Sequence, residues 1–132
     1  MLPTTPGRSV HLVVTIGRWA LVALFGVAGS AHFFASEFFT AIMPPYVPWH
    51  LQIVWLSGTF EIAGALGLTQ PKFRRAAGIG LILMAVAVFP ANLHMALHAS
   101  DYNAFPAWLL YLRLPLQLVI LFWIWRCAVR QP

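Results

Sequence analysis

The sequence predicts an all-α integral membrane protein, a four-helix bundle that forms a single domain over residues 1–132. Hydrophobic residues make up 61% of the chain and charged residues only 8%, whereas a soluble domain usually carries about 25% charged residues. Four apolar stretches each approach the roughly 20 residues that cross a bilayer. Backbone groups in lipid must be hydrogen-bonded within the protein, so we expect these stretches to be helices.

We expect the helices at about residues 12–34, 51–68, 76–97 and 105–127. The first contains Arg18 and is longer than the apolar region of a typical signal peptide, so we expect it to be retained. Residues 37–49 contain three prolines, which oppose a continuous helix. Their apolar character favours a segment along the membrane interface, with a short helical turn before Pro44. The connections at residues 69–75 and 99–103 are short.

The charges predict the orientation of the bundle. With four crossings, one side carries six basic residues, namely Arg8, Lys72, Arg74, Arg75, Arg126 and Arg130. The other side carries the acidic residues Glu37 and Asp101. Basic residues mark the cytoplasmic side, so we predict that the N- and C-termini are both cytoplasmic. Because the net charge of +5 is concentrated at helix ends, it indicates the lipid bilayer as partner and argues against nucleic acid.

Small residues recur in the apolar stretches and favour close helix packing rather than chemistry. The glycines concerned are Gly26, Gly29, Gly58, Gly64, Gly67, Gly78 and Gly80. The single cysteine, Cys127, excludes an internal disulfide and a dithiol relay. The sequence contains no phosphate-binding glycine loop, and its three acidic residues leave little scope for acid–base hydrolysis. Whether the chain is an enzyme stays open at this point.

Ionisable side chains inside a bilayer are costly and usually have a partner or a task. Glu61 falls near the middle of the second stretch; Arg18 and His32 share a face of the first, and Arg113 and Gln117 share a face of the fourth. Either arginine has the length to reach Glu61, and both together would leave a surplus positive charge for a polar ligand head group. Two interpretations remain: an ion pair that sets helix register, or a pocket that binds a ligand or handles protons.

The third stretch aligns Pro90, His94 and His98 on one face. Pro90 frees the carbonyl of Val86, which a kink would turn towards a neighbouring polar group. Asn92 points away from the histidine face in a regular helix, where it would relieve the kink. The spacing of His94 and His98 is compatible with a metal or haem ligand pair, but no cysteine or carboxylate cluster accompanies it, so we predict no metal site.

Several runs resemble the DoxX-like family of small four-helix membrane proteins. They are GSAHFF at 29–34, IMPPYVP at 42–48, SGTFEIAGALGL at 57–68, RAAG at 75–78 and MAVAVFPANLHMA at 84–96. The glutamate of the second helix and the FPAN run are the most specific. The resemblance implies a multi-pass protein of the bacterial inner (plasma) membrane. Its relatives include the small subunit of a thiosulfate:quinone oxidoreductase, proteins of redox maturation systems, and animal assembly chaperones.

The leading functional hypothesis is a redox-associated subunit whose bundle core binds a quinone or another apolar ligand with a polar head. The candidate ligand-binding residues are Glu61, Arg18, Arg113, His32, His94, Asn92 and Gln117. One alternative is an assembly or chaperone subunit for another membrane protein. Another is a small-molecule or proton transporter, in which a homodimer would enlarge the pathway. The cofactor is unknown, with a quinone as the candidate, and the missing cysteine pair argues against a thiol-redox role.

Overall fold

The computed structural model describes residues 6–130, which are all-helical apart from their connections. In order, the elements are α1 (Pro6–Phe34), α2 (Ser36–Ala41), α3 (His50–Thr69), α4 (Arg74–Leu97), the 3-10 turn η1 (Ala99–Asp101), α5 (Ala107–Ile124) and the π-helical turn η2 (Trp125–Val129). Four helices, α1, α3, α4 and α5 with η2, are long and apolar enough to cross a membrane. The predicted all-α fold with four bilayer-length helices is confirmed.

The outward surface of these helices is apolar. In the most apolar window of each helix, only 22% of the residues are buried in α1 and α3, and 17% in α4 and α5. Large hydrophobic side chains such as Val27, Leu66 and Phe122 are each more than half exposed. Water would make this arrangement unfavourable, whereas hydrocarbon is a suitable solvent for it.

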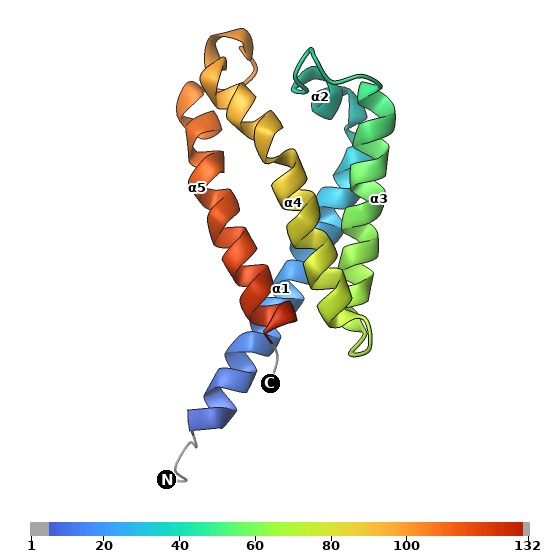
Figure 1. Cartoon of the computed structure of the whole chain (residues 1–132), viewed down its shortest axis with the longest axis vertical. Coiled ribbons are helices and arrows are strands. Elements are labelled where there is room, and N and C mark those ends of the chain that lie inside the picture. Colours follow the sequence, from blue (N-terminus) through green and yellow to red (C-terminus); the bar gives the residue numbers. More distant parts are fainter. Residues whose placement is uncertain (1–5, 131–132) are drawn as a thin grey trace.

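The helix bounds differ from the predicted ones mainly at the start of α1. This helix begins at Pro6 and has 29 residues, a length of about 43 Å. Its first turns extend beyond the other helices (Figure 1). Arg8 and His11 lower the hydropathy without breaking a helix, so hydropathy alone does not show where α1 begins. Proline suits a first helical position because the N–H it lacks would be unpaired there.

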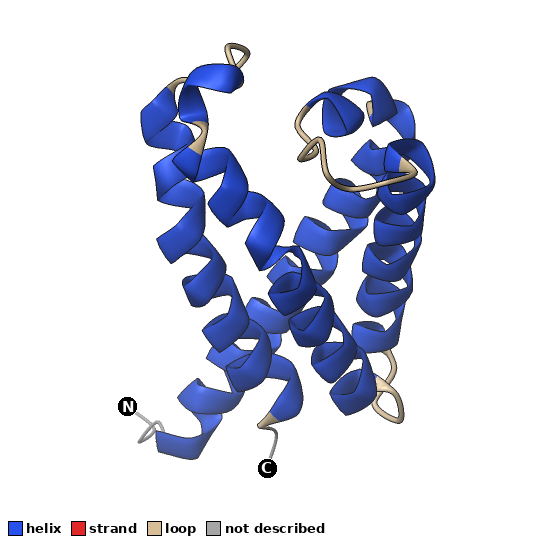
Figure 2. Ribbon diagram, turned by 45° about the horizontal axis from the view of Figure 1, so that its top comes forward, coloured by secondary structure: helices blue, strands red, loops and turns tan. Residues whose placement is uncertain are grey.

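The four long helices form two antiparallel pairs, α1 with α3 and α4 with α5, joined by contact of α3 with α4. The pairs meet at one end and diverge towards the other (Figures 1 and 2). The start of α1, the α3–α4 turn and η2 lie at the closed end, which we call the basic end because it carries Lys72, Arg74 and Arg126. The opposite end, with α2 and η1, is called the cavity end.

Both described ends of the chain, at Pro6 and Arg130, lie at the basic end (Figure 1). Four long helices that alternate in direction require this arrangement. The termini themselves, residues 1–5 and 131–132, lie outside the described residues, and their cytoplasmic location stays a prediction.

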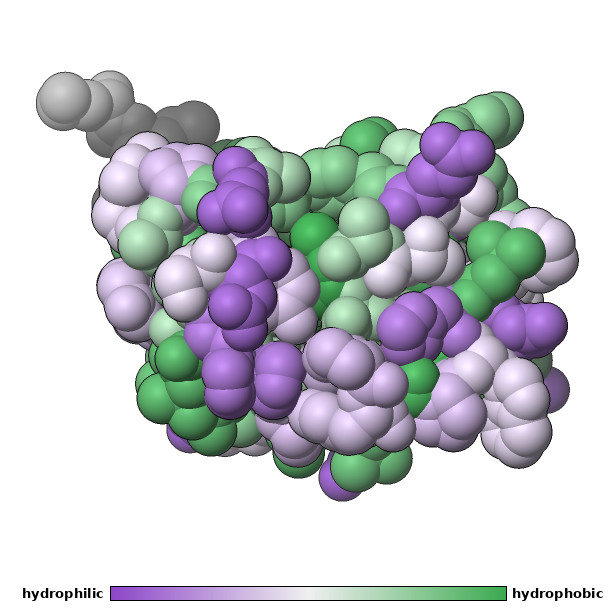
Figure 3. Space-filling view, turned by 90° about the horizontal axis from the view of Figure 1, so that it is seen from above, coloured by the Kyte–Doolittle hydropathy of each residue, from purple (hydrophilic) through white to green (hydrophobic). Residues whose placement is uncertain are grey.

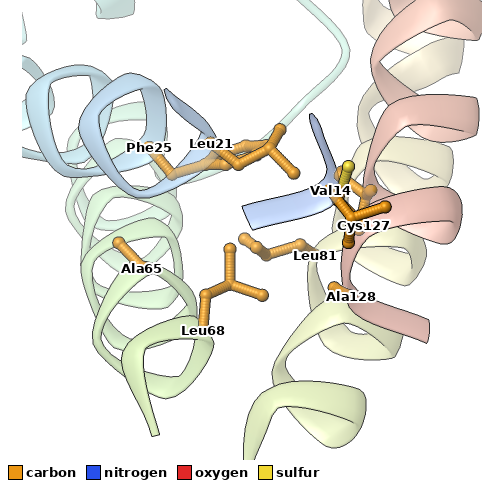
Figure 4. Close-up of a cluster of buried hydrophobic side chains, with 9 residues drawn as sticks. Val14, Leu21, Phe25, Ala65, Leu68, Leu81, Cys127 and Ala128 are labelled. Atoms are coloured by element: carbon orange, nitrogen blue, oxygen red, sulfur yellow. The ribbon is translucent and has the colours of Figure 1, made fainter. Parts of the chain in front are cut away.

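Residues from all four long helices form the main core, near the basic end (Figure 4). Its buried members are Val14, Leu21, Phe25, Ala65, Leu68, Leu81, Ile124, Cys127 and Ala128. A smaller core at the cavity end contains Met95, Tyr102 and Leu110. Ile42, from the segment after α2, packs against this second core and thereby joins the two helix pairs there.

Glycines set the closest helix contacts, as predicted. A Cβ built on Gly58 would lie 2.6 Å from the Cβ of His32 and 2.7 Å from the carbonyl oxygen of Gly29. Only glycine therefore allows α1 and α3 to approach this closely. Gly64, Gly67 and Gly78 pack in the same way against neighbouring helices. For Gly26 and Gly80 the prediction is wrong, because a Cβ built on either meets no atom within 4 Å.

We expect Gly58→Ala to destabilise the bundle by about 1–3 kcal/mol, the usual cost of overpacking, because the new methyl group would push α1 away from α3. The midpoint of thermal unfolding in detergent measures this effect. Gly80→Ala is the matched control and should leave the midpoint nearly unchanged. Equal midpoints for the two variants would contradict the glycine contact.

Candidate binding cavity

A cavity of about 220 Å³ lies between the two helix pairs at the cavity end. All five α-helices contribute to its wall. Most of the lining is aliphatic, aromatic or thioether, and the polar side chains are His32, Ser57, Asn92 and Arg113. Figure 3, which looks onto this end, shows hydrophilic residues in two groups separated by paler and hydrophobic ones. The wall is thus apolar with a few polar groups, the usual composition of a small-molecule site.

The segment comprising α2 and the loop up to His50 covers the cavity at the cavity end of the molecule. Five of its residues line the cavity: Phe39, Ile42, Met43, Pro44 and Val47. Two aromatic contacts connect it with the α4–α5 pair, Phe38 with Phe105 and Tyr46 with His94, each with ring centroids 5.1 Å apart. This segment therefore encloses the space between the diverging helices.

His32 links the cavity to a buried carboxyl group. Its Nδ1 lies 2.7 Å from the carbonyl oxygen of Ala28 and 3.1 Å from Oε2 of Glu61. The side chains of His32 and Glu61 are only 14% and 13% exposed. The imidazole ring lines the cavity and stacks on Phe39 with a centroid distance of 4.0 Å. Within the described residues, Oε2 of Glu61 has no hydrogen bond of good geometry, so this carboxyl group is only partly satisfied.

The expected convergence of two arginines on Glu61 is not observed. The ionisable side chain beside the carboxyl group of Glu61 is His32, with Nδ1 3.1 Å from Oε2. Arg18 instead lies at the basic end, where Arg74 and Cys127 are its electrostatic neighbours. It precedes Gly29, which contacts Glu61, by eleven residues, or about 16 Å of helix. A helical wheel gives angular position alone, and the distance along α1 is much longer than an arginine side chain.

Arg113 lies on the wall of the cavity. Its Nη1 donates to Sδ of Met95 at 3.7 Å. A thioether is a weak acceptor, whereas a guanidinium carries five N–H donors. The main positive charge at the cavity therefore has a weak hydrogen-bond partner among the described residues.

Asn92 and Gln117 form a polar link between α4 and α5. Nδ2 of Asn92 donates to Oε1 of Gln117 at 2.7 Å, and Nε2 of Gln117 donates to the carbonyl oxygen of Ala85. Gln117 is buried, with 7% exposure. The carbonyl predicted to meet a polar group near Pro90 is that of Val86, whereas the acceptor in the structure is its neighbour Ala85. Asn92 also lines the cavity.

His94 lies at the rim and outside the cavity lining. Its ring stacks on His98 with a centroid distance of 4.2 Å, and the hydroxyl oxygen of Tyr102 lies 3.4 Å from its Nδ1. Burial, followed by the nearby Asp101 and Tyr46, raises the pKa of Tyr102. No group of three or more His, Cys, Asp or Glu side chains suited to a metal occurs within residues 6–130.

Of the seven predicted site residues, the cavity wall contains His32, Asn92 and Arg113. Glu61 and Gln117 lie directly behind two of them, while His94 is at the rim and Arg18 at the basic end. The predicted site did not include Met95 or the segment after α1, both of which line the cavity. The apolar composition of residues 37–49 was the available signal for that segment.

A family model described as a domain of unknown function, DUF8561, matches residues 21–128. The matched region contains every residue of the cavity wall. No curated protein and no solved structure matches the chain.

We expect Gln117→Leu to destabilise the protein by about 0.5–2 kcal/mol, because Asn92 would lose its acceptor in an apolar interior. Thermal unfolding in detergent measures the loss. Gln52→Leu, which makes the same change at an exposed position of α3, is the control. A Gln117→Leu variant as stable as the control would show that this polar link contributes nothing.

Proposed function

This chain belongs to the family of domains of unknown function DUF8561, and we propose that it is a small redox-associated membrane protein that binds an apolar ring with a polar oxygen in its cavity. A quinone is the candidate ligand. The observation that supports this proposal is the guanidinium of Arg113, which lies on an otherwise largely apolar wall with a thioether as its hydrogen-bond partner.

A charged group inside a membrane needs strong acceptors to offset the water it has lost. The sulfur of Met95 offers little of this, so an oxygen placed in the cavity would form the better hydrogen bond with Arg113. Asn92 lines the same space, and the Nδ2 hydrogen that it does not give to Gln117 can bond a second oxygen. A ring with carbonyl oxygens on opposite edges meets both requirements.

The size of the cavity limits the ligand. Pockets for drug-sized molecules have volumes of about 300–1,000 Å³, and this cavity is smaller, at about 220 Å³. It suits one ring rather than a whole lipid. Ala87 and Val88 both line the cavity and are exposed on the outer surface. A ligand with an apolar tail would therefore leave its tail among the acyl chains beside α4.

The cellular setting is part of the same proposal. The resemblance to DoxX-like proteins supports a bacterial inner membrane, and it supports a role beside a redox enzyme that supplies or accepts the electrons of the quinone. The concentration of basic residues at one end supports cytoplasmic termini.

The binding proposal is tested with a short-chain quinone titrated into the purified protein. We expect Arg113→Met to weaken binding about tenfold or more, because a hydrogen bond to a charged group contributes about 1.5–3 kcal/mol. Arg75→Met, which removes an exposed charge at the basic end, is the matched control and should bind like the wild type. Absence of binding by the wild type would overturn the proposal.

Orientation is tested with a reporter enzyme that is active only outside the cytoplasm. Insertion of the reporter at Ser100, in η1, should give activity, because this turn lies at the cavity end. Insertion at Lys72 in the α3–α4 turn, or fusion after residue 132, should give none. The opposite pattern would show that the bundle is inserted the other way round.

A further inference from the structure

The geometry at His32 points to proton transfer, and we infer that His32 and Glu61 accept a proton from a hydroxyl-bearing ring, such as a quinol, bound in the cavity. This inference rests on the proposed binding function and adds the chemical state of the ligand. His32 is the group that contacts the ligand, and Glu61 is the buried group that receives the proton by way of His32.

The hydrogen bonds of the imidazole determine its tautomer. A carbonyl oxygen can only accept, so the 2.7 Å contact with Ala28 requires a hydrogen on Nδ1 of His32. In the neutral ring, Nε2 then carries a lone pair and no hydrogen. Because Nδ1 is held against α1 and α3, Nε2 is the nitrogen left for a molecule in the cavity. That molecule must then present a donor, such as a hydroxyl group.

The transfer balances without any further reactant. The O–H bond of the ligand breaks and a new N–H bond forms at Nε2 of His32. The Nδ1–H bond of His32 breaks and a new O–H bond forms at Oε2 of Glu61. The imidazole begins and ends neutral, with its tautomer exchanged. One negative charge leaves the carboxylate of Glu61 and appears on the ligand oxygen. The 3.1 Å separation of Nδ1 and Oε2 is within hydrogen-bond range, and a rotation of the ring that turns the Nδ1–H from the Ala28 carbonyl towards Oε2 precedes the transfer.

The surroundings favour a negative charge on the ligand over one on Glu61. Among the described residues that contact His32 or line the cavity, the charged or acidic side chains are Glu61 from α3 and Arg113 from α5, while Phe39 from α2, Asn92 from α4 and Ser57 from α3 are uncharged. Arg113 is thus the cation available to an oxyanion in the cavity. Oε2 of Glu61 lacks a well-aligned hydrogen bond, and receiving a proton would remove the charge from that oxygen.

The test compares a short-chain quinol with its quinone, which has no hydroxyl proton to give, over a range from mildly acidic to mildly alkaline pH. For the wild type we expect quinol binding to weaken about tenfold or more as the pH falls, because Glu61 that is already protonated cannot accept the proton. Quinone binding should lack this weakening. Glu61→Gln should make quinol binding independent of pH, and Glu37→Gln, the same change on an exposed carboxyl of α2, should behave like the wild type.

A second measurement uses the wild-type protein alone and so does not depend on whether a variant folds. Infrared difference spectra of the wild type should show the signal of a protonated carboxyl group on addition of quinol, and none on addition of quinone. Absence of that signal, or unchanged pH dependence in Glu61→Gln, would overturn the proton transfer while leaving the binding proposal intact. If neither probe binds the wild type at any pH, both proposals fail together.

Discussion

The close contact of α1 with α3 at Gly29 and Gly58 is the constraint on which the rest of the structure depends. With no side chain on either residue, the backbones approach until the Gly58 carbonyl meets the position that a Cβ of Gly29 would occupy. This contact sets the relative depth of the two helices, and it places His32 beside Glu61. A carboxyl group on a helix apolar enough to cross a membrane thereby receives a polar neighbour, which lipid would not offer.

The same packing explains why the cavity forms at one end. Small residues and a continuous apolar core hold all four helices together near the basic end. At the other end the helix pairs diverge, and contact between them depends on the segment after α1 and on the small core around Met95. At this level Asn92 of α4 donates a hydrogen bond to Gln117 of α5. The diverging pairs therefore leave a space whose remaining strong donor is Arg113.

Much of the candidate site could be predicted from the cost of polar groups in hydrocarbon. That argument selected His32, Glu61, Asn92, Arg113 and Gln117, which the structure gathers in or directly behind one cavity wall. It failed for Arg18, because a shared helix face says nothing about distance along the axis. It also paired Glu61 with arginine, since charge alone favours that match, whereas helix packing brings histidine closer.

The sequence by itself determined that this protein has four long apolar helices. Its hydropathy, small number of charges and prolines predict four bilayer-length helices, because a backbone placed in lipid would have to hydrogen-bond to itself. Tertiary structure alone decided which polar groups meet, how far the helix pairs diverge and which nitrogen of His32 is bonded to the backbone. These features depend on contacts a few ångströms apart between residues distant in the chain, and periodicity within one helix carries no information about the register of its neighbour.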